Sequence, residues 1–406
     1  MFFKLLKDAL KVKNVRNKIL FTIFIIFVFR VGTHVTVPGI NAESLKQLSD
    51  LPFLNMLNLV SGNAMNNFSI FSMGVSPYIT ASIIVQLLQM DIYPKFVEWG
   101  KQGEVGRRKL NQATRYITLV LAFVQSIGIT ASFNTLSSIS LVKTPNVSTY
   151  LLIGTILTAG SIIVTWLGEQ ITDKGFGNGV SMIIFSGIIA SIPKMFSTIY
   201  EDFFVNIRSG ELTRSYIIVA LLIVVGLAIV FFTTFVQQAE YQIPIQYTKL
   251  VQGAPTSSYL PLKVNPAGVI PVIFASSITT IPSTILPFFS KVTWLSHLQG
   301  LLSYNTPSGM ITYAILIILF SFFYTFVQVN PEKTAENLQK NGSYIPSVRP
   351  GRETEKYMSS LLKRLATIGA VFLAFISLAP IAAQQFMHLT SSIALGGTSL
   401  LILIST

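Results

Sequence analysis

Long apolar segments alternate with short polar ones along almost the whole chain. A membrane-spanning helix needs about 20 mostly apolar residues, and most of these segments are about that long. The second segment is short, and the chain stops at Thr406 inside the last, so we expect further C-terminal sequence. The pattern predicts an all-α, polytopic membrane protein with ten spans, at about 19–37, 76–90, 114–133, 149–167, 178–193, 215–237, 266–288, 309–329, 364–386 and 392–406.

The composition supports this interpretation. Charged residues make up 11% of the 406 residues and hydrophobic residues 51%, whereas a soluble domain is typically about 25% charged. A disordered chain is therefore excluded, and a soluble enzyme is disfavoured. The chain has no cysteine, which excludes disulfides, a thiolate nucleophile and cysteine metal ligands.

The net charge of +13 is interpreted as the excess of Lys and Arg that cytoplasmic loops of a membrane protein carry. When the loops are assigned alternately to the two sides, most of the 29 Lys and Arg residues fall on the side of the N-terminus, as cytoplasmic loops require. The loops on the outer side hold only Lys46, Lys143, Lys194, Arg208, Arg214 and Lys291. We therefore expect both ends in the cytoplasm. No cleavable signal peptide is expected, because the first apolar run lacks a small-residue cleavage pattern.

The chain lacks the groups that catalysis or ion coupling would need. None of its 16 acidic residues lies in the middle of a predicted span, and His34, His297 and His388 share no ligand spacing. No phosphate-binding P-loop motif is present. We expect no enzyme activity, catalytic residue, metal or cofactor. A passive route lined by neutral side chains remains. The alternatives are a small-solute secondary transporter with inverted repeats, which usually needs buried acids, and an intramembrane enzyme.

Five predicted spans lie on each side of the loop near 194–214, which suggests an N-terminal half, 1–200, and a C-terminal half, 201–406. An odd number of spans per half makes the halves inverted, and inverted halves often place a pathway at their interface. The polar stretch 58–73 is either half-inserted in a funnel, where polar backbone is tolerated, or an ordinary outer loop. Arg30, the one charge inside a span, is expected to snorkel outward.

Two large cytoplasmic segments, 101–109 and 330–363, are basic. Such charge sets topology and contacts anionic lipids. Arg349 differs because it precedes Pro350-Gly351 in a turn that should be rigid. An arginine fixed at a loop tip can offer a donor fork to a partner's carboxylate or phosphate, so docking and topology both remain open for this residue.

Seven motifs, in order along almost the whole chain, resemble the SecY family, the pore subunits of the bacterial Sec protein translocase. They lie at 29–40, 74–88, 101–109, 166–179, 261–271, 348–351 and 396–401. The resemblance implies a passive protein-conducting channel in the bacterial plasma membrane, with two inverted halves around a central pore. Unfolded preproteins would cross it, and apolar helices would leave sideways into lipid. The energy would come from an external motor or ribosome.

The resemblance also implies site residues. An apolar ring would close the pore, formed by Val75, Ile79, Ile184, Ile273 and Ile402. A plug at about 61–72 would include Asn63, Asn66, Asn67 and Phe68, small and amide residues that suit easy release. A lateral gate would carry polar positions at Thr80, Gln125 and Ser277, whose hydrogen bonds would hold it shut. Docking of the motor or ribosome would use Arg349, Arg107, Arg108 and Lys249.

The partners implied are a SecE-type clamp subunit, a SecG-type small subunit, the SecA ATPase motor, the ribosome, signal peptides with their preproteins, and anionic lipids. One departure concerns the loop 238–265, whose tip usually carries several basic residues in this family. Here Lys249 is the single basic residue of the tip, so partner contact there should be less electrostatic.

Overall fold

The computed structural model describes residues 11–41, 61–62, 64–90, 92–136, 142, 145–205, 212–247, 257–285, 306–387 and 396–405. A helix coincides with each predicted apolar run. These helices are α2 (Lys13–Gly32), α5 (Ser76–Leu88), α7 (Gly103–Leu136), α8 (Val147–Lys174), α9 (Gly179–Tyr200), α10 (Leu212–Gln238), α11 (Ile270–Ile285), α13 (Pro307–Gln328), α15 (Arg352–Met387) and α16 (Gly396–Ser405). Two shorter polar helices, α6 (Pro94–Lys101) and α14 (Pro331–Lys340), and the π-helical turn η1 (Glu201–Val205) complete the helical part.

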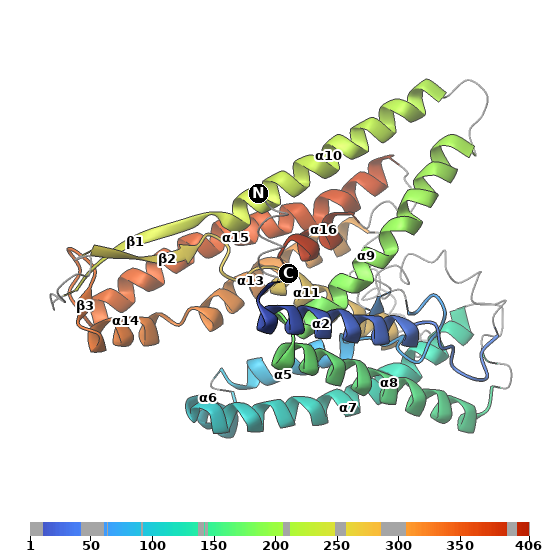
Figure 1. Cartoon of the computed structure of the whole chain (residues 1–406), viewed down its shortest axis with the longest axis horizontal. Helices are drawn as coiled ribbons and strands as arrows, with labels where there is room; N and C mark the ends of the chain where they lie inside the picture. Colours follow the sequence, from blue (N-terminus) through green and yellow to red (C-terminus); the bar gives the residue numbers. More distant parts are fainter. Residues whose placement is uncertain are drawn as a thin grey trace.

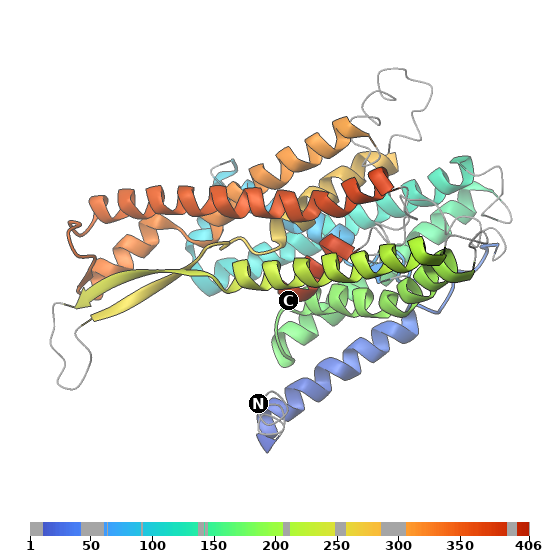
Figure 2. The ribbon, with the colours of Figure 1, turned by 90° about the horizontal axis from the view of Figure 1, so that it is seen from above.

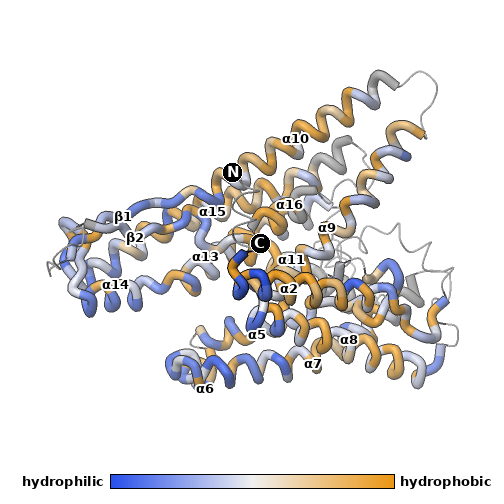
Figure 3. The backbone as a smooth tube through the Cα atoms, in the orientation of Figure 1, coloured by the Kyte–Doolittle hydropathy of each residue, from blue (hydrophilic) through white to orange (hydrophobic). Residues whose placement is uncertain are grey.

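Six helices of the described part are long and apolar enough to cross a membrane, namely α7, α8, α9 with its extension η1, α10, α13 and α15. Helices α5 and α11 are apolar but shorter. Helix α10 faces outward, since only 6% of its apolar window is buried and Phe231 and Phe235 are largely exposed. Figure 3 shows the apolar colour running along these helices. The molecule is a mostly helical, multi-pass membrane protein. Its division into halves at residue 200 stays a prediction.

A small antiparallel sheet stands at one end of the bundle, where the sequence pattern had predicted only a loop. Its strands β1 (Glu240–Tyr247), β2 (Ser257–Lys263) and β3 (Ser343–Tyr344) lie in the order β2-β1-β3. Glu240 pairs with Lys263. The buried Ile243 of β1 packs with Met358 and Leu362 of α15, so the sheet is fastened to the long helix that follows it.

Helix α15 explains why this end projects. Its 36 residues span about 54 Å at 1.5 Å per residue, well over the roughly 30 Å of a bilayer core. The helix is therefore longer than a bilayer core requires, and its first part projects from one end of the bundle together with the sheet and α14 (Figures 1 and 2). The polar start of α7 and helix α6 lie towards the same end (Figure 1), the end at which the charge pattern predicts the cytoplasm.

The largest apolar core lies where the helices converge. It combines buried side chains of α2, α5, α8, α9, α11, α13, α15 and α16. A second cluster joins Met65, Phe68 and Met73 to Ile153 and Leu157 of α8. The segment before α5 is thus part of the packed interior, which places it beside the candidate site.

Candidate functional site

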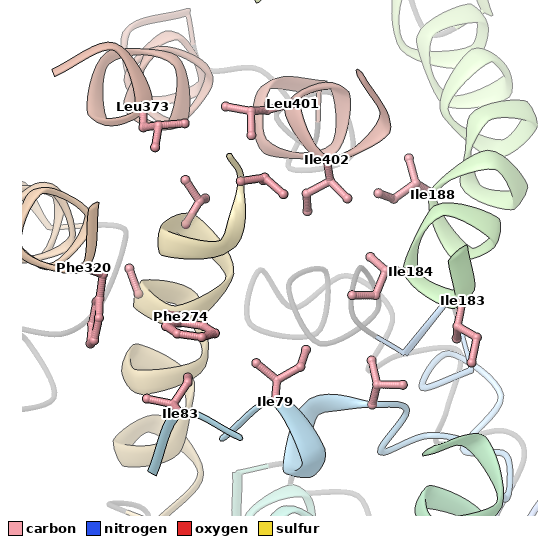
Figure 4. Packing of buried hydrophobic residues seen from close by; sticks show 14 of the residues in the cluster. Ile79, Ile83, Ile183, Ile184, Ile188, Phe274, Phe320, Leu373, Leu401 and Ile402 are labelled. Carbon is pink, nitrogen blue, oxygen red and sulfur yellow. The ribbon is translucent and has the colours of Figure 1, made fainter. Parts of the chain in front are cut away.

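The five residues of the predicted ring come together in the structure. Val75, Ile79, Ile184 and Ile402 are buried in the largest apolar cluster, and Ile273 packs against it half-buried. They come from α5 and the residue before it, α9, α11 and α16. In Figure 4, Ile79, Ile184 and Ile402 point towards a common centre. Four separate helices therefore contribute one uncharged collar of branched side chains.

A cavity of about 370 Å³ opens against this collar. Ile79, Ile184 and Ile273 line it on the collar side, and Gln86, Asn111, Arg115, Glu169 and Asp173 are among its polar lining residues. It lies where α8 ends and α9 begins, and we call it the vestibule. Its polar lining suits water or a polypeptide backbone, whereas the collar side chains beside it are apolar. Gln86 and Glu169 lie within the family motifs at 74–88 and 166–179, but no role in the site was predicted for any of these polar residues.

The vestibule wall is held by specific contacts. The Arg115 guanidinium donates two hydrogen bonds to the Glu169 carboxylate, at 2.9 and 2.7 Å, and so joins α7 to α8. Asn178 caps α9, since its Oδ1 accepts hydrogen bonds from the backbone N–H groups of Val180 and Ser181. A Cβ at Gly179 would lie 1.8 Å from the Gly168 oxygen. This close approach of α9 to α8 fixes the place of Ile184 on the collar.

The predicted plug segment precedes the collar residue Val75 in the sequence and is hydrogen-bonded to the residues that follow α2. The Val37 N–H donates to the Phe68 oxygen at 3.1 Å, and the Ile70 N–H donates to the Val35 oxygen at 2.9 Å. Ser161 Oγ of α8 donates to the Gly74 oxygen at 3.0 Å. Among the predicted plug residues, Asn66 and Asn67 are half-buried, Phe68 is buried, and Asn63 lies outside the described residues.

Two sequence-based expectations about this segment need correction. The first is that small and amide residues suit easy release of the segment; the segment also contains Met65, Phe68 and Phe71, which are buried in the apolar clusters. The second is that Arg30 would snorkel outward. Its Nη1 donates to the Gly62 oxygen at 2.7 Å, and its Nη2 donates to the Ser186 oxygen of α9. The segment is therefore bound by apolar packing and by the forked guanidinium of the half-buried Arg30.

The predicted gate residues are all buried, with Thr80 on α5, Gln125 on α7 and Ser277 on α11. Helix α11 contacts both α5 and α7, so the seam between them is closed. However, the Thr80 hydroxyl donates to the Ser76 oxygen and the Ser277 hydroxyl to the Ile273 oxygen, each within its own helix. The expected hydrogen bonds between gate helices are therefore not made by these two donors, and helix packing has the larger part.

Three of the four predicted docking residues, Arg107, Arg108 and Arg349, lie towards the projecting end. Arg107 and Arg108 are exposed on the first turns of α7. Arg349 is also exposed, and its carbonyl oxygen accepts a hydrogen bond from Thr354 Oγ1 at 2.9 Å. Gly351 follows at φ +94°, a conformation that favours glycine. The turn is thus fixed as predicted, while Lys249 lies outside the described residues.

Comparison with known proteins identifies the family to which this architecture belongs. A family model described as SecY matches residues 69–406, more than half of the chain. The chain belongs to the SecY family. It is 71% identical to the protein translocase subunit SecY of Streptococcus sanguinis, covering 100% of this chain and 94% of that protein. It is 50% identical to the protein of the same name from Bacillus subtilis, over 99% of this chain and 94% of the relative.

Solved structures share the fold at low sequence identity. One, described as the structure of a protein conducting channel, aligns with a TM-score of 0.68 at 15% identity and covers 96% of this chain and 89% of that one. Sec61 in the canine ribosome-channel complex aligns with a TM-score of 0.63 at 14% identity, with the same coverage. These likenesses show the SecY-type fold. The alternative of a small-solute transporter gains no support from these relatives.

Proposed function

We propose that the chain is the central subunit of a protein-conducting channel that moves unfolded secretory polypeptides across the bacterial plasma membrane and releases transmembrane segments sideways into lipid. The N-terminus would be cytoplasmic. The observation that carries this proposal is the collar: branched apolar residues from four helices meet between a polar vestibule and a packed plug segment. The name shared by the relatives, protein translocase subunit, supports the same assignment.

The collar suits a seal around a moving chain. Narrow apolar constrictions block ions by dewetting, and side chains such as Ile79 and Ile184 can part around a polypeptide without breaking any ion pair or hydrogen bond. Polar groups of the vestibule can solvate the backbone before it reaches the collar. The seal needs no chemistry of its own, so the driving force must come from a partner.

Lateral release would use the seam between α5 and α7 on one side and α11 and α13 on the other. Hydrogen bonds between membrane helices contribute about 0.6 kcal/mol on average. An apolar signal helix gains about 25 cal/mol for each Å² of apolar surface that it buries. A few hundred Å² therefore outweigh several such bonds, and an apolar signal can open a seam held mainly by packing.

The exposed arginines Arg107, Arg108 and Arg349, with Lys249, would dock the SecA motor or the ribosome on the cytoplasmic end. A SecE-type clamp and a SecG-type small subunit would surround the helices, and anionic lipids would contact the basic loops. A guanidinium fork held on a rigid turn can recognise a partner's carboxylate in two-point fashion, which supports Arg349 as the principal docking residue.

Reconstitution tests this proposal. The purified complex is placed in vesicles with the motor ATPase, ATP and a preprotein that carries a signal sequence. We expect preprotein to become protected from external protease, and a vesicle without the complex is the control. Flux of small solutes without any protection of preprotein would contradict the proposal.

A further inference from the structure

Arg30 connects three parts of the molecule that are far apart in sequence. It lies near the end of α2. Its guanidinium donates to two carbonyl oxygens, that of Gly62 at the start of the plug segment and that of Ser186 on α9. These acceptors are 32 and 156 residues away along the chain. The guanidinium also lies 5.7 Å from the ring centroid of Phe29. A forked donor is well suited to hold two acceptors at once.

The surroundings of Gly62 leave little room for movement. Its φ is +68°, and a Cβ there would lie 3.1 Å from Phe29 and 3.2 Å from the Gly187 Cα. The backbone of the plug segment is therefore pressed into the joint between α2 and α9 at the point where Arg30 binds it. This tight joint and the arginine fork are independent features of the same place.

The other end of the segment is fastened to the same helix. The rings of Phe29 and Phe71 stack with centroids 5.9 Å apart and an angle of 6° between their planes. A Cβ at Gly32 would lie 2.0 Å from the Phe71 ring. Residues 29, 30 and 32 of α2 thus contact the plug segment at both its start and its end.

We propose that Arg30 is a positioning residue of the channel, a latch that binds the start of the plug segment to α9 in the closed state. The inference rests on the proposed function. Ser186 follows the collar residue Ile184 by two positions on α9, so the latch ties the plug to a helix that forms the collar. When a polypeptide pushes α9 aside, the fork loses its second acceptor, and the plug segment is released together with the collar's opening.

The magnitude follows from the loss of one bond between membrane elements. Losing one such hydrogen bond changes an equilibrium constant by about threefold to about twentyfold. Replacing Arg30 by Gln should therefore raise the population of the released plug by a factor in this range. Lys keeps the charge but lacks the planar fork, so Arg30→Lys should lie between the parent and Arg30→Gln.

The test uses the purified membrane complex in vesicles. The chain has no cysteine, so Asn67→Cys in the half-buried plug segment provides a single thiol in this subunit. The rate at which a membrane-impermeant maleimide labels that thiol from the outer side reports local opening. Arg16→Gln is the matched control, because Arg16 is an exposed residue of the same helix. Resting ion leak is recorded in parallel.

We expect Arg30→Gln to raise both the labelling rate and the leak by about threefold to twentyfold, and Arg16→Gln to leave both unchanged. Gly62→Ala should act in the same direction without touching the arginine, and the double variant should fall short of the product of the two effects, because both loosen one joint. If the thiol at position 67 is labelled at the parent rate in the Arg30→Gln variant, the inference is overturned. If Arg30→Gln does not assemble, Gly62→Ala decides, and an unchanged rate there overturns it.

Preprotein protection by the parent complex is measured in the same vesicles. If the parent fails to protect preprotein, the proposed function fails, whereas the labelling comparison still reports whether Arg30 holds the segment. The two failures are therefore distinguishable.

Discussion

Replacing Gly160 by Ala should release the plug segment from α8. Gly160 is buried on α8, and a Cβ there would lie 1.9 Å from the Ile70 oxygen and 2.8 Å from the Ile70 carbonyl carbon. Ordinary contact needs about 3.4 Å, so the plug backbone and α8 must separate by roughly 1.5 Å. The next residue, Ser161, donates to the Gly74 oxygen, and the same shift would break that bond.

Overpacking of this kind costs about 1–3 kcal/mol. Since the strain exists only while the segment is seated, it should favour the released state by about fivefold to 150-fold. The assay is resting ion conductance of the reconstituted complex, together with export of a preprotein whose signal sequence is defective. Both should rise.

Gly226→Ala is the control, because a Cβ there meets nothing within 4 Å and the residue lies on the membrane-spanning α10. It should leave conductance and export unchanged. Recovery of the variant complex at parental yield shows that it folds. A Gly160→Ala complex that assembles but has parental conductance and parental signal dependence would refute the reasoning, since the plug would then not be seated against α8.

Three further predictions concern the collar, the gate and the docking turn. Ile79→Ser should wet the collar and raise resting ion conductance, and a complex as tight as the parent would contradict the collar's role. Gln125→Leu should change the dependence of export on signal-sequence hydrophobicity by about threefold to twentyfold, and an unchanged dependence in a secretion assay would count against a gate position. Arg349→Glu should lower motor-driven export about tenfold or more while the protein stays inserted, and normal export would remove Arg349 from the docking surface.

The helices could be predicted from the sequence because each apolar run is continuous and its environment is lipid or neighbouring helices. Both environments favour an apolar helix, so the run predicts a helix whichever of the two surrounds it. The sheet was missed for a different reason. Ile243 and Ile245 show the alternation of a strand, but Pro244 and Pro261 count against one. The structure tolerates both, since β2 is an edge strand and β1 meets β3 only at Gln246 and Tyr247.

Some residues of the candidate site could likewise be predicted from the sequence, and others could not. Motif resemblance identified collar residues, and the structure brings these together. It could not reveal what Arg30 binds, because both acceptors are backbone oxygens, and any residue type supplies those. The vestibule pair Arg115 and Glu169, 54 positions apart, was equally hidden, since only the packing of α7 on α8 makes them neighbours. The hydroxyls of Thr80 and Ser277 bond to carbonyl oxygens within their own helices, and residue type alone could not show whether they would do so or bond across the gate.

The most direct test of the central claim asks whether a moving polypeptide touches the collar. A preprotein is stalled during translocation by a folded C-terminal domain, and a photo-crosslinking residue is placed at Ile79, at Ile402 or at Ile223, an exposed position on the outward face of α10. We predict crosslinks to the stalled chain from positions 79 and 402 and none from position 223. A stalled chain that crosslinks to neither collar position, or equally to all three, would contradict a path through the collar.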